Sequence, residues 1–281
     1  MPVLMGANSF ANKAELVSAL NGDISDIANW DVSAITDMRS LFKDKKTFNA
    51  DISNWNTASV TDMSYMFFNG QAFNQPLNFD TSKVKTMSHM FYLARAFNQS
   101  LSFNMSSVTT IDHMFANAYK FNKPLTFDTS SVTNMGMMFA YAYEFNQPVN
   151  FDTSGVTSMY GMFYFANNAP SKFNQPLNFD TSKVTNMYEM LYGAREFNQP
   201  LSFDTSRVTN MYRMFRQATT FNQPLSFDTS SVGDMRDMFT WAHSLSAANK
   251  LLIRCAWAGT LAFASAGYGS SWGPGSCASP N

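Results

Sequence analysis

The sequence predicts an α/β repeat solenoid, in which coils of about 24 residues carry short stacked parallel strands and helical turns. One observation is a formula, FNQPLxFDTSxVTxMxxMFxxA, which recurs along most of the 281-residue chain. Another is the composition, because 27 Phe and 20 Met beside 14% charged residues indicate one core recipe used many times. The third is the spacing of the Phe–Asn pairs, at intervals of 25, 24, 24, 24, 28, 24 and 24 residues; these pairs begin at Phe48, Phe73, Phe97, Phe121, Phe145, Phe173, Phe197 and Phe221.

Within a unit, the apolar pattern predicts one short strand and leaves the next segment open. Leu77 and Phe79 alternate with polar neighbours, as in a half-buried strand. Val84, Met87 and Met90 follow at spacings of three, which fits a helical stripe or a second strand that runs into a helical turn. Either form resembles a leucine-rich-repeat coil, whose strands stack in parallel about 4.8 Å apart.

The chain divides into three predicted parts: an N-terminal helical cap (1–22), a repeat solenoid of about eight full units and one partial unit (23–242), and a C-terminal helical cap and tail (243–281). Asn12 and Glu15 resemble a capping box before the first predicted helix. The segment SLSAANKLLIRCAWAGTLAF predicts a second amphipathic helix. Capped ends protect the open core, so we expect a monomer.

Two polar columns recur at the predicted corners of the coils. Aspartates before Thr–Ser are expected to turn the chain by accepting hydrogen bonds from nearby amides, with Ca²⁺ binding as the alternative. Asparagines that follow the recurring Phe of each coil are expected to form a stacked amide ladder. The two columns comprise Asp80, Asp128, Asp152, Asp180, Asp204 and Asp228, and Asn74, Asn98, Asn122, Asn146, Asn174, Asn198 and Asn222.

Charge and hydropathy exclude some partners. The net charge of −1 and the absence of a basic run disfavour nucleic acid. We expect no transmembrane segment and no leader peptide, since no apolar run is long enough to span a bilayer and the first residues lack a basic segment. The two cysteines, Cys255 and Cys277, lie close in sequence, so they are either bridged in an oxidising compartment or free thiols.

The repeat units resemble those of a known family. The segments WDVSAITDMRSLF, WNTASVTDMSYMF and FNQPLNFDTSKVTNMYEML are similar to the BspA-like leucine-rich-repeat surface proteins, whose repeat is also described as a mycoplasma-lipoprotein-type repeat of unknown function. The resemblance covers about residues 23–242. It implies an extracellular or cell-surface solenoid that functions in adhesion or recognition, with no catalytic residues to transfer.

Candidate binding residues are expected at repeat positions that vary and face solvent. Tyrosines gather at these positions in units five to seven, next to an insertion of four residues within YFANNAPSK (164–172). Such rings could form a platform for a glycan or a protein partner, or could simply cover the core. The candidate ligand-binding residues are Tyr160, Tyr188, Tyr212, Tyr164 and Tyr192.

Catalytic and metal-binding patterns are sparse. The sequence has three histidines and no GxSxG, HExxH, P-loop or CxxC motif, so we expect neither an enzyme nor a cofactor. His89 and His113 occupy one column in adjacent coils, with Asp112 beside His113, which makes them weak candidates for a shared transition metal.

Two further functions are alternatives to recognition. Regular threonine columns are a pattern also found in ice-binding proteins, although threonine is a common strand and turn residue. A scaffold subunit of a larger assembly would instead expose an apolar patch. The threonine columns comprise Thr109, Thr133, Thr157, Thr185 and Thr209, and Thr129, Thr153, Thr181, Thr205 and Thr229.

Overall fold

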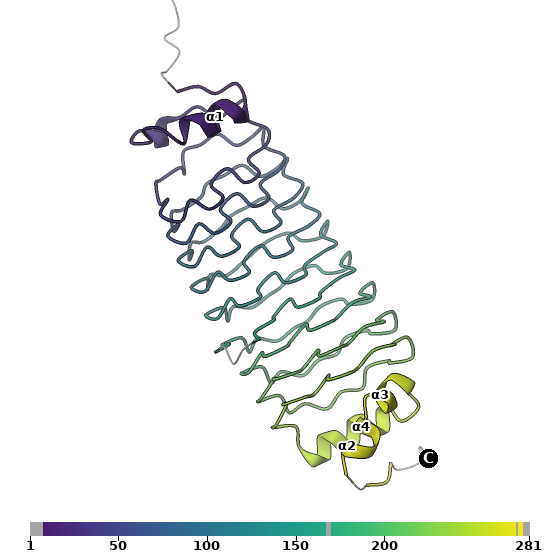
Figure 1. Ribbon diagram of the computed structural model, residues 1–281. Coiled ribbons are helices and arrows are strands. Elements are labelled where there is room, and N and C mark those ends of the chain that lie inside the picture. Colours follow the sequence, from purple (N-terminus) through teal and green to yellow (C-terminus); the bar gives the residue numbers. More distant parts are fainter. Residues whose placement is uncertain (1–7, 167–169, 274, 278–281) are drawn as a thin grey trace, which may run out of the picture.

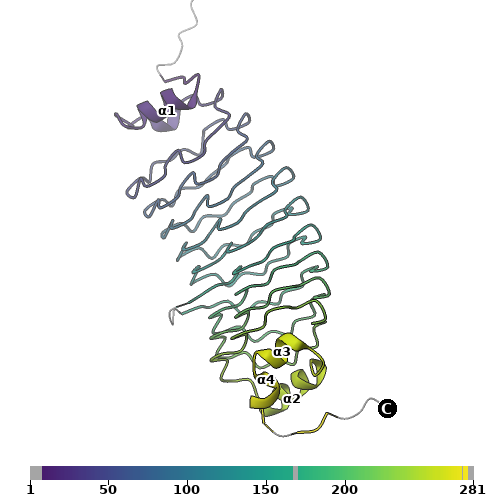
Figure 2. The same cartoon turned by 45° about the vertical axis from the view of Figure 1, so that its right-hand side comes forward.

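The chain forms an elongated stack of coils with helices at both ends. The computed structural model describes residues 8–166, 170–273 and 275–277. Helix α1 (Lys13–Ala19) lies at one end of the stack, and helices α2 (Ala247–Ala256), α3 (Leu261–Ser265) and α4 (Tyr268–Ser271) lie at the other (Figure 1). A second view shows the same coils one behind the other between the two helical ends (Figure 2).

Like positions of successive coils lie next to each other, as the phenylalanines show. The rings of Phe97, Phe121 and Phe145 stack in one row, with centroids 6.0 and 5.9 Å apart. A second row includes Phe91, whose ring stacks on Phe115 at 5.6 Å and on Phe97 of the first row at 4.1 Å. All of these side chains are buried. The core is therefore two parallel rows of stacked rings, lined by the Val and Met columns.

Backbone pairing between coils is parallel, but it is confined to isolated bridges. One bridge column links consecutive coils on the N-terminal side of the first Met, for example Thr86 with Thr110 and Thr110 with Asn134. At the expected strand, Leu77 forms a single bridge with Leu101. Among the described residues, no ladder of several consecutive bridges forms there. The coils thus have less regular β-structure than the α/β pattern led us to expect.

The segment that the sequence left open forms consecutive turns and no helix. The amides of Met90 and Tyr92 donate to the carbonyls of Met87 and His89, three residues earlier. His89 and Leu93 have positive φ angles of 59° and 60°, and this left-handed geometry recurs at equivalent positions in most coils. A left-handed residue stops helix propagation. The amides of Met87 and His89 point along the stack and donate to carbonyls of the next coil, and most coils repeat these contacts.

The Asp–Thr–Ser corner turns the chain as predicted. The Asp80 carboxylate accepts a 2.9 Å hydrogen bond from the amide of Ser82, two residues on, and the same contact recurs in the other coils with this sequence. Hydrogen bonds from the serine hold the pKa of each of these carboxyls below its usual value. The threonine between them is buried, and its hydroxyl donates to a carbonyl of the next coil, as from Thr129 to Asp152 at 2.8 Å.

The asparagine column forms a ladder whose rungs join side chain to backbone. The Asn74 side-chain oxygen accepts a hydrogen bond from the amide of Asn98, 2.8 Å away, and the contact repeats along the stack up to the amide of Ser246. The neighbouring glutamines strengthen it, because Gln99 donates from Nε2 to the Asn74 backbone carbonyl at 2.9 Å.

The N-terminal helix closes its end of the core. Asn12 accepts a hydrogen bond from the amide of Glu15, while the Glu15 carboxylate accepts one from the amide of Ala11, so the expected capping residues are in place. Leu16 and Leu20 are buried, whereas Val17 is exposed. A single 3₁₀ turn, η1 (Ile27–Asn29), leads from this helix into the first coil.

At the C-terminal end, three short helices replace the one expected helix. Trp257, at the end of α2, lies against Phe227 and Phe239 of the last coil, and its indole N–H donates to the Phe227 carbonyl at 3.0 Å. Cys255 and Cys277 form a disulfide with Cα atoms 5.3 Å apart. This bridge ties the tail to α2.

Candidate functional site

The turn segments of successive coils form one face of the stack, called the turn face below. It displays the residues between the two Met positions and those after the Met–Phe pair. Buried Met and Phe side chains anchor each turn, so the residues between them are held in register from coil to coil. Its rows are Ser64, Ser88, Asp112, Gly136, Tyr160, Tyr188, Tyr212 and Arg236; Tyr65, His89, His113, Met137, Gly161, Glu189, Arg213 and Asp237; Phe68, Tyr92, Ala116, Ala140, Tyr164, Tyr192, Arg216 and Thr240; and Asn69, Leu93, Asn117, Tyr141, Phe165, Gly193, Gln217 and Trp241.

The predicted tyrosine platform is divided into separate groups. Tyr188 and Tyr212 stack with ring centroids 5.5 Å apart. Tyr164 lies 4.9 Å from Tyr192 in a tilted arrangement. Tyr160 packs elsewhere, with its ring edge-on to His113 at 6.1 Å. The five rings therefore do not present one continuous surface.

Glycine and burial explain this division. A Cβ atom at Gly136 would lie 2.0 Å from the Tyr160 ring, so the missing side chain lets Tyr160 lie across the neighbouring coil. Tyr192 is only 8% exposed, which corrects its place among the surface candidates. Burial raises the pKa of Tyr160 and of Tyr164 above the usual value of a phenol, so both hydroxyls remain protonated at neutral pH.

Arginines join the remaining aromatic rings into a surface that the sequence did not single out. The Arg213 guanidinium lies 4.4 Å from the Tyr212 ring centroid, and that of Arg216 lies 4.3 Å from the ring of Trp241. Both are within cation–π range. Trp241 has 49% of its surface exposed and a left-handed φ of 65°. This aromatic–arginine surface comprises Tyr188, Tyr212, Arg213, Arg216 and Trp241.

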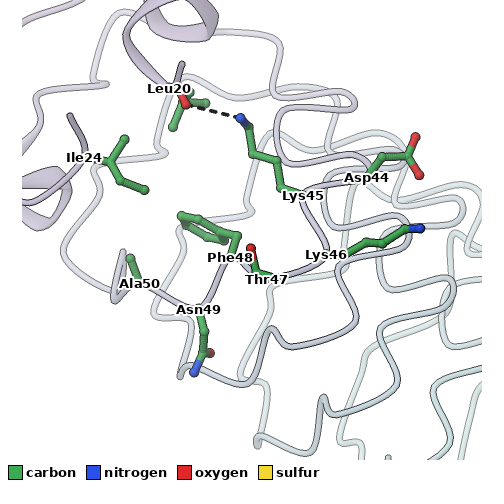
Figure 3. A pocket seen from close by; sticks show the side chains of 9 residues that line it. All are labelled: Leu20, Ile24, Asp44, Lys45, Lys46, Thr47, Phe48, Asn49 and Ala50. Atoms are coloured by element: carbon green, nitrogen blue, oxygen red, sulfur yellow. Dashed lines mark hydrogen bonds between the residues drawn. The ribbon is translucent and has the colours of Figure 1, made fainter. Parts of the chain in front are cut away.

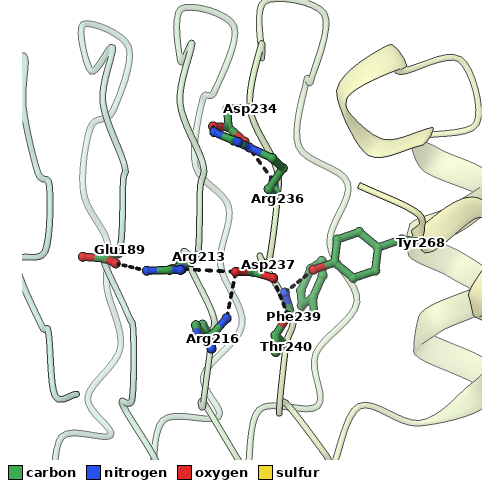
Figure 4. A network of polar contacts seen from close by, with 9 residues as sticks. All are labelled: Glu189, Arg213, Arg216, Asp234, Arg236, Asp237, Phe239, Thr240 and Tyr268. Atoms are coloured by element: carbon green, nitrogen blue, oxygen red, sulfur yellow. Dashed lines mark hydrogen bonds and ion pairs between the residues drawn. The ribbon is translucent and has the colours of Figure 1, made fainter. Parts of the chain in front are cut away.

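Carboxylates hold these arginines in place (Figure 4). Asp237 accepts hydrogen bonds from Arg216 at 2.8 Å and from Arg213 at 3.2 Å. Glu189, which is 7% exposed, lies 3.5 Å from Arg213. Burial raises the pKa of Glu189, and this effect outweighs the opposing hydrogen bond from Tyr188 and the charge of Arg213.

A pocket of about 250 Å³ adjoins Trp241 and is also lined by Arg195, Gln217, Thr219 and His243. The Gln217 side-chain oxygen is buried and accepts no hydrogen bond from the part of the chain that the structure describes. A buried acceptor of this kind typically bonds to an ordered water. Trp241, Arg213, Arg216 and Gln217 were missed because their contacts join different columns of the repeat.

Several larger pockets are present among the described residues. One, of about 540 Å³, lies between the end of α1 and an early coil, where Lys45 donates to the Leu20 carbonyl at 3.2 Å beside the Phe48 ring (Figure 3). Another, of about 700 Å³, is lined by Pro170, Lys172 and Glu196 among others, and it shares Arg195 with the pocket beside Trp241. It adjoins the predicted recognition insertion, of which residues 167–169 lie outside the described part.

His89, Asp112 and His113 come together on the turn face. The two imidazole rings stack with centroids 4.3 Å apart. Asp112 Oδ2 lies 3.2 Å from His113 Nδ1 and 3.7 Å from His89 Nδ1. Burial lowers the pKa of His89 to about 4, with His113 adding to the effect and Asp112 opposing it. Burial alone would raise the pKa of Asp112, but hydrogen bonds from His113, Ser88 and Thr110 hold it well below its usual range.

The two threonine columns differ in exposure. The inner column, including Thr129 and Thr153, is buried and donates to backbone carbonyls, so it cannot meet an ice surface, contrary to one expectation. The outer column, including Thr133 and Thr157, is exposed, and each hydroxyl donates to a carbonyl of the preceding coil at 3.2–3.3 Å.

Comparison with known families assigns the chain. A family model described as "Mycoplasma protein of unknown function, DUF285" matches residues 8–125, 101–177 and 163–252. The chain belongs to the DUF285 family. The overlapping DUF285 matches also identify it as a repeat protein, and its members' function is not known. No curated protein and no solved structure matches the chain. In the described residues, no helix is long and apolar enough to cross a membrane.

Proposed function

We propose that this DUF285 protein is a non-catalytic recognition module, a leucine-rich-repeat-like solenoid that binds a glycan at the aromatic–arginine surface. The observation that carries the proposal is Trp241, whose indole is half exposed beside a pocket of about 250 Å³ that Thr219 and His243 also line. Among the described residues of the coils, Trp241 is the large hydrophobic side chain left exposed, which favours a functional reason for its presence.

The chemistry of the surface suits a sugar. Aromatic faces such as those of Trp241, Tyr188 and Tyr212 offer rigid apolar area against the C–H face of a pyranose ring. Hydroxyl groups of the same ring could accept from Arg213 and exchange hydrogen bonds with Thr219 and His243, which line the pocket. The ion pairs with Asp237 pre-organise both arginines, so little conformational entropy is lost on binding.

The location that we propose is extracellular or at the cell surface. The Cys255–Cys277 disulfide supports it, because such bridges persist mainly in oxidising compartments. The resemblance of the repeat to BspA-like surface proteins supports it as well.

A glycan array with the intact protein, followed by calorimetry on any hit, tests the function. Trp241→Ala is expected to weaken binding at least tenfold, and the double variant Tyr188→Ala/Tyr212→Ala to weaken it as well. Tyr119→Ala is the matched control, because Tyr119 also carries an arginine over its ring, from Arg95 at 5.2 Å, outside the proposed surface. Binding that survives Trp241→Ala would contradict the glycan proposal. A protein array that finds ligands when the glycan array finds none would contradict it as well.

Ice binding is a second candidate, favoured by the exposed outer threonine column. Its hydroxyls are held in a regular row by hydrogen bonds to the neighbouring coil. Thermal hysteresis in the wild-type protein, lost in Thr133→Lys/Thr157→Lys, would favour it over glycan recognition.

A scaffold role has less support. The large hydrophobic side chains exposed among the described residues are Val17, Trp241, Leu252 and Leu261. Of these, Trp241 alone belongs to the coils, so the described part of the stack offers no broad apolar patch for a partner subunit.

A further inference from the structure

Three side chains on two adjacent coils form a cluster with the composition of a transition-metal site. His89, Asp112 and His113 each offer a ligand atom, and these atoms all lie within 4.8 Å of one another. A tetrahedral ion with ligand distances of about 2.0–2.1 Å needs ligand atoms about 3.3 Å apart. The separations of 3.2 and 3.7 Å from Asp112 Oδ2 to the two Nδ1 atoms are close to this value.

One nitrogen of the cluster has an unmet polar requirement. His89 Nδ1 is buried and has no hydrogen-bond partner in the described part of the chain. A buried polar atom without a partner lowers stability, and such atoms in folded proteins call for an explanation. An ion between His89 and Asp112 would meet this requirement, because the Nδ1 lone pair would coordinate it.

The carboxylate is oriented as in known metal sites. Asp112 Oδ1 accepts hydrogen bonds from the hydroxyls of Thr110, at 2.8 Å, and of Ser88. These contacts occupy one carboxylate oxygen, and they leave Oδ2 facing both imidazoles. Hydrogen bonds from residues outside the ligand set typically orient ligands in this way.

The backbone holds the two histidines at equal positions. His89 and His113 have left-handed φ angles of 59° and 56°, and the His89 amide donates to the Asp112 carbonyl at 2.9 Å. Two coils are thereby locked in register at the cluster.

We propose that His89, Asp112 and His113 bind one divalent transition-metal ion, of which Zn²⁺ is the representative, with at least one coordination position left to water. Two imidazoles and one carboxylate suit zinc and its neighbours in the first transition series, whereas Ca²⁺ and Mg²⁺ prefer all-oxygen ligands. The site lies apart from the aromatic–arginine surface and is independent of glycan binding.

The repeat supplies substitutions that the fold already accepts. Asp112→Ser copies Ser88 of the preceding coil, and His113→Met copies Met137 of the following coil, which has the same left-handed φ. His243→Gln is the matched control, because His243 is the remaining histidine of the chain and is exposed outside the cluster. Thermal unfolding of each variant with a chelator present checks that the fold is kept.

The test is titration of the metal-free, full-length protein with Co²⁺ and Zn²⁺, followed by visible absorption, calorimetry and thermal unfolding. We expect one Co²⁺ per chain with d–d absorption bands, displacement by Zn²⁺, and a rise in the thermal midpoint. Asp112→Ser and His113→Met should each weaken binding at least tenfold, and His243→Gln should leave it unchanged. No binding by the wild-type protein, or binding that persists in both cluster variants, would overturn the proposal.

Discussion

The backbone amide of Asn122 donates a hydrogen bond to the side-chain oxygen of Asn98, 3.0 Å away in the neighbouring coil. Each asparagine of this column both accepts such a bond from one neighbour and donates one to the other. The ladder thus supplies partners for amides that the isolated β-bridges leave unpaired. It joins the coils at a corner where neither strand nor helix is present.

Removal of one rung is expected to destabilise the stack. Asn98→Ala leaves the amide of Asn122, which is partly buried, without its acceptor, and such a loss costs about 1–3 kcal/mol. The midpoint of urea unfolding, followed by circular dichroism, measures the effect. Asn98→Asp retains the acceptor oxygen and should cost less. Equal losses in the two variants would show that the side-chain oxygen is not what stabilises the rung.

The buried carboxylate of Glu189 is expected to reduce stability at neutral pH. Burial raises its pKa above the unfolded value of about 4.5. A raised folded pKa means that the contribution to stability is complete below pH 4.5 and is lost as the pH rises through the folded pKa. Glu189→Gln should therefore raise the urea midpoint at pH 7 and change it little at pH 4.

Asp237→Asn is the contrasting variant for the same arginines. Asp237 is more exposed than Glu189 and bonds to Arg213 and Arg216, so its loss should lower stability at pH 7 by up to about 1 kcal/mol. The two substitutions each remove one negative charge but should act in opposite directions. A lower midpoint for Glu189→Gln at pH 7 would mean that its ion pair with Arg213 outweighs its burial.

Two glycines on the turn face are expected to differ in their tolerance of a methyl group. Both have left-handed φ angles, a conformation that costs a non-glycine residue about 1–2 kcal/mol. In Gly193→Ala the new Cβ would lie 2.0 Å from the backbone carbonyl oxygen of Phe165, whereas in Gly161→Ala it would meet the flexible side chain of Met137. Gly193→Ala should therefore lower the urea midpoint more than Gly161→Ala, and the reverse order would contradict the role of the rigid carbonyl.

The 24-residue spacing was sufficient to predict the period, the rows and the corners of this protein. Because a 24-residue spacing repeats, Phe97, Phe121 and Phe145 had to occupy equal positions, and their rings stack as that register requires. The corner at Asp80 was also readable, since its contact with Ser82 spans only two residues and depends on local chemistry.

The turns within each coil and the contacts between columns could be found only from the packing of one coil against the next. Val84, Met87 and Met90 have a spacing that fits a helix, yet hydrogen bonds to the next coil stabilise left-handed residues between them and replace the helix with turns. Contacts between columns, such as that of Arg216 with Trp241, depend on the offset of one coil from the next. A repeat pattern contains no information on that offset, because it aligns each residue only with its own column.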